Sequence, residues 1–440
     1  MCCGLHASST EYHFVGGGLA EESVLTDDLV RQLINVGEVD ILVGLPTHNN
    51  AKSVGPVVHA IQEGLLKGFP RERVVIVNAD GGSRDGTPDL VTGASIDDMR
   101  HGYKGYALRT LHSISTRYAN NPSARGGLRT ILAAAELLRA KACAVVSPES
   151  TGMEPEWIPR LLRPVYHDNF DLVTPIYRRH KFEGLLVSNL VYPMTRALYG
   201  QRIREPYASE FAFSARLGSH SLAHNPGSYD SDGSGAEMEL TMSAITGGFR
   251  TYQSFLGTKI HGEREGGDLV PAMRRTVGVL FSSLEANVAA WSSGNGSQPV
   301  PTLGSESEVT LESIRVNRKR LQQMFCAGVA ELEPVFRSIL SATTLAELQQ
   351  IASLGEDDFR YPAELWVRTV YEFAASYAKS VMSRDHIIQG LAPLYRGRIF
   401  TFLEENRSSS AEEVEKNIES LCIEFERLKP YLLEVWNTKK

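Results

Sequence analysis

An amide and a carboxylate follow an apolar run in a pattern that suits nucleotide binding. The run Val74–Val77 leads into Asn78 and Asp80, and a glycine-rich turn, Gly81–Thr87, comes next. An apolar run that ends in turn residues is typical of a buried parallel strand. Ligands of open α/β sheets bind at the carboxyl ends of such strands, where Asp80 suits a contact with a base or a ribose.

The preceding apolar run has the same form. Residues 41–46 (ILVGLP) lead into Thr47-His48-Asn49-Asn50. Two strand–loop–helix units in succession indicate a nucleotide-binding half-domain. No GxxxxGK[ST] or GxGxxG sequence follows either strand, which argues against a P-loop or a dinucleotide fold.

A third stretch offers a candidate for metal chemistry. An apolar run ends at Val146, Ser147-Pro148-Glu149 follows, and residues 155–158 (PEWI) begin a helix. At this strand tip, nucleotide-sugar transferases usually carry a D-x-D sequence, whose carboxylates hold a divalent cation against the diphosphate. Only the last acid is present here. Residue type alone leaves Glu149 either as a metal ligand or as an exposed loop acid.

Two further candidates for a metal site are weaker. Residues 230–232 form a literal D-x-D sequence, but Ala236 and Met238 fall where a calcium loop needs oxygen ligands, so we expect a flexible loop. His261 follows a strand-like segment, and a single histidine is more often structural or solvated than a ligand.

Three loop segments carry charges that suit a ligand. Arg125–Gly127 places a cation in a glycine-rich turn before a helix, where it could face a phosphate or a ribose. Glu205–Glu210 ends in an acid that either grips an acceptor hydroxyl or caps an element. Tyr177–Lys181 is a basic cluster that either binds an anionic acceptor or is a solvated loop. No Ser/His/Asp elbow or Cys/His pairing is evident, so hydrolase chemistry gains no support.

Alternating strands and helices must position these residues. We expect strands at 41–46, 74–80, 142–146, 172–176, 211–214 and 251–256, and helices at 21–36, 53–67, 128–141 and 237–246. This order predicts an α/β fold with a mainly parallel sheet flanked by helices.

Beyond residue 266 the strand pattern stops and helical periodicity dominates. We expect helices at 268–291, 310–340, 345–352, 362–382, 384–403 and 411–436, with a Gly/Ser/Pro linker at 292–307. The chain therefore divides into three expected parts, which are a tail and helix at 1–36, a nucleotide-binding domain at 37–265 and a helical C-terminal domain at 266–440.

The composition is that of an ordinary globular protein, with 42% hydrophobic and 22% charged residues in a chain of 440. The net charge of −7 gives no reason to expect a nucleic-acid partner. No apolar run reaches the roughly 18 residues of a membrane span, and the N-terminus lacks the pattern of a secretory signal. Five scattered cysteines fit a reducing interior, so we expect a cytoplasmic protein.

Taken in order, these segments resemble a known family. The chain resembles the glucosylglycerate synthases, relatives of the glucosyl-3-phosphoglycerate and mannosylglycerate synthases, which are retaining glycosyltransferases of the GT-A fold. The matching segments are VGLPTHNNAKSVGPVV, VVIVNADGGSRDGT, RGGLRTILAA, PEWI, YRRHKFEGLLVSNLVYPMTRALYG, REPYASEFAFS, EMELTMSAITGGF, FLGTKIHGERE, ELWVRTVYEFAASYAKS, APLYRGRIFTFLEE and LCIEFERLKPYLLEVW. The resemblance covers about residues 38–440.

The resemblance implies a role for each candidate residue. The residues implied around the donor nucleotide are Pro46, Asn49, Asn50, Asp80, Arg125 and Gly126. The implied ligands of a divalent cation, Mg²⁺ or Mn²⁺, are Glu149 and His261. The implied catalytic acids are Glu210, which would contact the donor sugar or the acceptor, and Glu237, beside the acceptor pocket. The segment Phe182–Val187 would line the acceptor site.

This sequence departs from the family pattern at three places. Ser147 and Pro148 replace the first two residues of the D-x-D sequence, and the loss of a carboxylate should weaken metal binding. Residues 207–209 stand where the family has a small, glycine-containing sequence. Leu185 replaces an arginine of the phosphoglycerate-using relatives, which favours free glycerate over a phosphorylated acceptor.

The resemblance implies a metal-assisted, front-face transfer with retention of a hexose, glucose above all. The implied donor is GDP- or UDP-glucose, and the implied acceptor is D-glycerate or a similar small hydroxy acid. It also implies a possible homodimer. Two alternatives stay open. One is a degenerate GT-A protein that binds a nucleotide sugar or a partner without turnover. The other is a nucleotidyltransferase, which is disfavoured because no basic glycine-rich signature follows the first strand.

Overall fold

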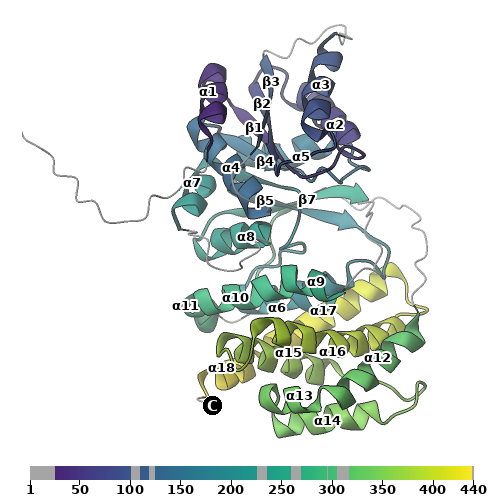
Figure 1. The fold of residues 1–440 in the computed structure, drawn as a ribbon. Helices are drawn as coiled ribbons and strands as arrows, with labels where there is room; N and C mark the ends of the chain where they lie inside the picture. The colour runs from purple at the N-terminus through teal and green to yellow at the C-terminus, as the bar shows by residue number, and fades with distance from the viewer. Residues whose placement is uncertain are drawn as a thin grey trace, which may run out of the picture.

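One mixed sheet organises the first part of the chain in the computed structural model (Figure 1). The structure describes residues 25–100, 110–117, 124–224, 235–258, 269–294, 296–304 and 317–438. Its strands are β1 (Ile41–Thr47), β2 (Arg73–Asp80), β3 (Thr110–Arg117), β4 (Ala142–Val145), β5 (Leu172–Arg178), β6 (Phe211–Ser214), β7 (Thr251–Thr258) and β8 (Thr302–Leu303). The eight strands lie in the order β3-β2-β1-β4-β6-β5-β7-β8. Within the described residues, β6 alone runs antiparallel to its neighbours, so the mainly parallel sheet is confirmed.

Helices cover both faces of this sheet. On one face lie α2 (Val54–Gly68), α3 (Thr87–Arg100) and α5 (Trp157–Tyr166), and on the other lie α1 (Asp27–Val36), α4 (Ala124–Leu137), α7 (Ala215–His224) and α8 (Ala236–Thr246). Successive side chains of a strand point to opposite faces, and accordingly Ile41 and Val43 pack in one core while Leu42 packs in the other. Burial on both faces explains why β1 and β2 read as continuous apolar runs.

The strand order creates a switch point between β1 and β4. From β1 to β3 the chain moves toward one edge of the sheet, with α2 and α3 on one face. Then α4 crosses on the opposite face and leads to β4 on the other side of β1. The loops that follow β1 and β4 therefore leave neighbouring strand ends, where open α/β sheets form a ligand-binding crevice.

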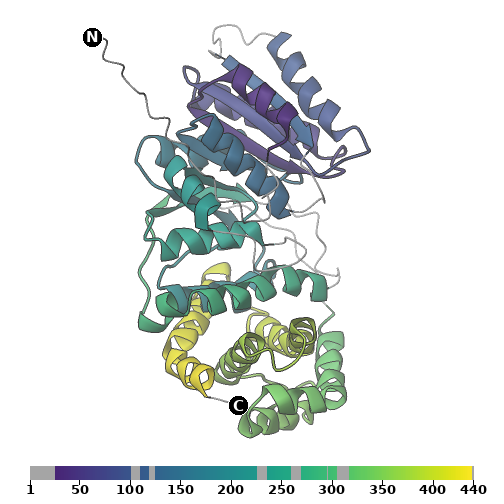
Figure 2. The ribbon, with the colours of Figure 1, turned by 60° about the vertical axis from the view of Figure 1, so that its left-hand side comes forward.

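Apart from β8, the described residues beyond 266 form helices and the turns between them, as expected. After the π-helix η1 (Val187–Val191) and α6 (Tyr192–Tyr199), the helices are α9 (Leu269–Met273), the π-helix η2 (Arg274–Gly278), α10 (Val279–Ala286), α11 (Val288–Ser293), α12 (Arg318–Glu331), α13 (Glu333–Ile339), α14 (Ala342–Ala352), α15 (Ala363–Ala378), α16 (Arg384–Glu405), α17 (Ala411–Arg427) and α18 (Lys429–Asn437). Figures 1 and 2 show the sheet at one end of the molecule and the green to yellow helices at the other. No helix of the described ranges has the length and apolarity to cross a membrane.

The largest apolar core spans the predicted boundary at residue 265. It combines α6 and α8 with the C-terminal helices, for example Met194 and Met242 with Trp366. The Arg196 guanidinium of α6 is 1% exposed and donates to Glu419 and Glu426 of α17, at 2.5 and 2.8 Å. The division into parts stays a prediction, but the core of the helical region extends across residue 265 to α6 and to α8, a helix that also packs on the sheet.

Candidate functional site

Polar side chains converge where β1 and β2 end together. The two strands pair in parallel so that Thr47 lies beside Asp80 and Pro46 beside Ala79. The Thr47 hydroxyl lies 2.7 Å from Asn78 Oδ1 and 3.1 Å from Asp80 Oδ1, both of them acceptors. The N–H of Gly81 donates to the Thr47 carbonyl at 2.7 Å. Pro46, the second-last residue of β1, therefore lies at the strand end where these polar side chains meet.

Asp80 fastens the loop that follows β2. Its side chain is 1% exposed. Its Oδ2 accepts from the N–H groups of Gly82 and Ser83 at 2.9 and 2.8 Å, and its Oδ1 accepts from the hydroxyls of Ser83 and Thr47 at 2.5 and 3.1 Å. A carboxylate offers about four lone-pair positions; three donors occupy them here, and Thr47 shares its single proton between Asp80 and Asn78. These bonds assign Asp80 to the loop, and its contact with a base stays a prediction.

Asn49 and Asn50 connect the two loops. Asn49 adopts a φ of 56°, its N–H donates to the Ser83 hydroxyl at 2.8 Å, and its Oδ1 accepts from the Arg84 N–H at 3.0 Å. Asparagine is among the residues that tolerate this left-handed conformation. The N–H of Asn50 donates to the Thr87 hydroxyl at 2.9 Å. The turn after β1 is therefore held against the start of α3.

The structure brings Glu149 to Asn50 at the switch point. Glu149 lies in the loop after β4, is exposed, and has its Oε1 3.4 Å from Asn50 Nδ2. A residue predicted to lie beside the nucleoside and one predicted as a metal ligand, from the loops after two neighbouring strands, are thus adjacent. No group of three or more His, Cys, Asp or Glu that could hold a metal exists among the described residues. His261, the other predicted ligand, and residues 230–232 lie outside them.

The described residues alone do not fit a divalent cation. They offer one carboxylate, Glu149, with an amide beside it, whereas Mg²⁺ and Mn²⁺ require several oxygen ligands. Of the two residues predicted near the phosphates, Arg125 lies in the first turn of α4 and its side chain lies outside the described part. The Gly126 carbonyl accepts from the Thr130 hydroxyl at 2.8 Å.

Glu210 is buried beneath the loop that carries Glu149. It is 0% exposed, and its Oε1 accepts from the Ser150 hydroxyl while its Oε2 accepts from the Tyr177 phenol. Sequence reasoning missed both partners, since Ser150 carried no signal and Tyr177 was read only as part of a basic cluster. Burial, and next the charge of Glu210, raise the pKa of Tyr177 well above its ordinary value, so the phenol keeps its proton and donates.

Glu237 is a second acid in the same surroundings. It lies in the first turn of α8, and its Oε2 is buried without a hydrogen-bond partner among the described residues. Burial, and next the neighbouring charge of Glu210, raise the pKa of Glu237 above its ordinary value. A pair of acids in unequal environments is typical of sites that move or orient protons.

Two cations of the basic segment, Arg179 and Lys181, are bound within the fold. Arg179 pairs with Glu205 at 3.1 Å, and both side chains are largely buried. The Lys181 ammonium donates to the carbonyls of Asn406, Arg407 and Ser409 at 3.0, 3.2 and 2.8 Å, in the turn between α16 and α17.

Two further residues bear on the predicted acceptor site. Arg178 has a buried Nη1 without a partner among the described residues. Arg179 likewise has a buried Nε without a partner among the described residues. Leu185, one of the residues predicted to line the acceptor site, is 4% exposed and packs in the helical core.

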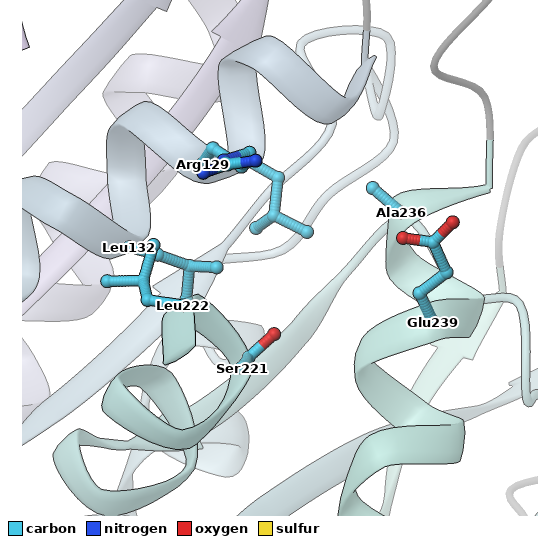
Figure 3. A pocket seen from close by; sticks show the side chains of 7 residues that line it. Arg129, Leu132, Ser221, Leu222, Ala236 and Glu239 are labelled. Carbon is cyan, nitrogen blue, oxygen red and sulfur yellow. The ribbon is translucent and has the colours of Figure 1, made fainter. Parts of the chain in front are cut away.

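A pocket on the α4 face of the sheet is too small for a nucleotide sugar. It lies between α4, α7 and α8, and Figure 3 shows Arg129, Ser221 and Glu239 around it. Its volume is about 20 Å³. That space corresponds to little more than one water molecule.

The chain is similar in structure to several solved enzymes at low sequence identity. It is similar to glucosyl-3-phosphoglycerate synthase from Mycobacterium tuberculosis in complex with phosphoglyceric acid, with a TM-score of 0.42 and 18% identity over 59% of this chain and 83% of that one. The same enzyme with Mn²⁺, UDP and glucosyl-3-phosphoglycerate gives 0.42 and 17% over 61% and 85%. Mannosyl-3-phosphoglycerate synthase from Rubrobacter xylanophilus gives 0.39 and 15% over 60% and 78%.

Two other comparisons found nothing. No family model matches the chain, and no curated protein matches it. Structural similarity at this level does not assign the chain to a family. The ligands bound in these enzyme structures are therefore not attributed to this chain.

Proposed function

We propose that the chain is a retaining GT-A glycosyltransferase that moves a hexose, glucose above all, from a nucleoside-diphosphate sugar to D-glycerate or a similar small hydroxy acid. The observation that carries this proposal is the meeting of Asn50 and Glu149, 3.4 Å apart, at the switch point between β1 and β4. That is where α/β sheets bind nucleotides. The sequence resemblance along residues 38–440 supports the choice of a sugar donor.

On the donor side, the chain's own residues bind and orient the nucleotide. Pro46, Asn49 and Asn50 line the nucleoside, with Asp80 holding their loop in place. For Arg125 and Gly126, at the start of α4, we propose a contact with the ribose or the phosphates, because the N-terminus of a helix attracts anions.

A divalent cation, Mg²⁺ or Mn²⁺, belongs to this proposal. Glu149 and, outside the described residues, His261 would be its protein ligands. Such a cation would neutralise the departing diphosphate.

On the acceptor side, two acids divide the work. Glu210 is the fixed carboxylate, and Glu237 is the acid whose Oε2 has no partner among the described residues and can meet the acceptor hydroxyl. In a front-face reaction the hydroxyl enters on the side from which the diphosphate leaves. Catalysis then comes from positioning and fixed charges rather than from a covalent nucleophile.

A second function is favoured by one specific observation. The loop after β4 presents a single carboxylate, because Ser147 and Pro148 replace the first two residues of the D-x-D sequence. A protein of this kind could bind a nucleotide sugar without turnover. The free cysteines Cys143, Cys326 and Cys422 accord with the proposed cytoplasmic location, and a homodimer is proposed by family analogy alone.

The test is acceptor-dependent release of nucleoside diphosphate. The full chain is incubated with UDP- or GDP-glucose, D-glycerate and Mg²⁺ or Mn²⁺, with parallel reactions that lack D-glycerate or contain phosphoglycerate. We expect release that requires D-glycerate, together with a glucosylated product by mass spectrometry. Binding of the sugar nucleotide with no release under any metal would favour the second function. Release of nucleoside diphosphate at the same rate with and without D-glycerate would refute the transferase proposal.

A further inference from the structure

The loop after β4 connects two parts of the site. The N–H of Ser150 donates to the Ser147 carbonyl at 3.2 Å, which closes a tight turn around Glu149. Glu149 is exposed and lies beside Asn50, whereas Ser150 is 4% exposed and its hydroxyl donates to Glu210. Consecutive residues of one turn thus contact the donor side and the buried carboxylate.

Glu210 is held from two directions. Ser150 donates to one carboxylate oxygen from the β4 loop, and Tyr177 donates to the other from the end of β5. An ionised carboxyl in a buried place is destabilised unless donors replace the lost water. Two hydroxyls, one from the loop after β4 and one from β5, meet this need and also fix the plane of the carboxylate.

Tyr177 is itself fixed by its surroundings. It is 7% exposed, its ring centroid lies 5.8 Å from that of Trp157, and the Arg179 guanidinium lies 5.3 Å from the ring. Trp157 begins α5, the helix that follows the β4 loop. The phenol therefore has little freedom to turn away from Glu210.

We infer that Tyr177 and Ser150 are positioning residues that hold Glu210 as an oriented carboxylate and tie it to the turn that carries Glu149. Neither hydroxyl needs to touch a substrate, because both act through Glu210. The effect on turnover rests on the proposed function, whereas the coupling between the three side chains does not.

The test is a double-mutant cycle of Tyr177→Phe and Glu210→Gln, which keep the shapes of both side chains. If Tyr177 acts through Glu210, its hydroxyl matters only while the carboxylate is present. We expect Tyr177→Phe alone to lower kcat about 10- to 100-fold, with the donor KM changed less than about threefold, as for the loss of a hydrogen bond to a charged group. In the Glu210→Gln background the same change should lower kcat less than about twofold.

A matched control and a second readout keep the result decisive. Tyr252→Phe, at a partly buried tyrosine of β7, should leave kcat unchanged. Ser150→Ala should reproduce the loss seen with Tyr177→Phe, which covers the case in which one variant fails to fold. If the wild-type chain turns over no donor, the proposed function fails. The double-mutant cycle is then measured as changes in the free energy of unfolding by urea. Full kcat in Tyr177→Phe, or equal losses with and without the Glu210 carboxylate in either readout, would overturn the inference.

Discussion

Replacing Asp80 by alanine should destabilise the protein far more than replacing it by asparagine. The Asp80→Ala change leaves the N–H groups of Gly82 and Ser83 without their acceptor. Ser83 is buried and Gly82 is partly buried. An orphaned buried donor costs about 1–3 kcal/mol, so the two together should lower the free energy of unfolding by about 2–5 kcal/mol.

The Asp80→Asn change should be accommodated. The amide oxygen can accept both N–H groups, and the amide nitrogen then faces the hydroxyls of Thr47 and Ser83. Both hydroxyls can turn to accept, and Thr47 can still donate to Asn78, 2.7 Å away. What is lost is the strengthening by charge, which amounts to about 1–2 kcal/mol over these bonds.

Urea unfolding of both variants measures this difference. Asp89→Asn is the control, because Asp89 is exposed and has no hydrogen-bond partner among the described residues. Calorimetry with UDP and GDP gives the second observable, and both variants should weaken the two nucleotides alike, since the loop as a whole is loosened. Equal stability of the two Asp80 variants would refute this reasoning. So would an Asp80→Asn protein of unchanged stability whose preference between UDP and GDP is altered, because Asp80 would then contact the base.

Three further predictions concern other parts of the site. Glu149→Ala should weaken Mn²⁺-dependent UDP binding about tenfold or more, as measured by calorimetry. Glu154→Ala, at an exposed glutamate nearby in the sequence, should leave the affinity unchanged. Equal UDP affinities of the two variants would show that Glu149 is not a metal ligand. The pKa of Glu237 is raised by burial and then by Glu210, so the folded state binds its proton more tightly. Stability should therefore fall as pH rises from 4.5 through the folded pKa, and thermal unfolding of Glu237→Gln should lack this fall; a parallel pH profile would contradict it. Lys181→Met should lower the free energy of unfolding by about 1–3 kcal/mol and raise the acceptor KM more than the donor KM. Lys52→Met, at an exposed lysine, serves as the control. Unchanged stability of Lys181→Met would show that the three carbonyls do not need the ammonium.

The strands buried on both faces were predictable and the edge strands were not. β1 and β2 are continuous apolar runs, and the predicted ranges agree with the observed ones to within a residue. β3 (TLHSISTR) was missed because an edge strand alternates with polar residues. β8, two exposed residues within the predicted linker, was missed because only its pairing with β7 makes it a strand. That part of the linker expectation was wrong.

The helical region was predicted with too few breaks. The expected helices at 310–340 and 411–436 each divide in the described residues, at Leu332 and Leu428. Pro334 and Pro430 lie two residues further, where proline suits the first turn of a new helix. The signal was therefore present in the sequence.

The site shows a different limit. Asn50 and Glu149 were identifiable because each follows an apolar strand. The bonds of Ser150 and Tyr177 to Glu210 join residues 60 and 33 positions apart, and no local pattern links such distant residues. Asp80 was recognised as important, but the donors that fill its carboxylate come from the folded loop. Residue type predicted which side chains gather, and tertiary contacts decide which of them remain open to a ligand.

The ion pairs of Arg196 make the middle of the polypeptide depend on its C-terminal helices during synthesis. Its partners Glu419 and Glu426 are translated more than two hundred residues later. Until α17 emerges, α6 carries an unpaired cation destined for the interior, and a buried charge without its partner costs about 3–5 kcal/mol. A chain released early would thus fail to close its core and would expose apolar surface to proteases and chaperones. The place of α6 in the fold is therefore secured only after α17 has been made.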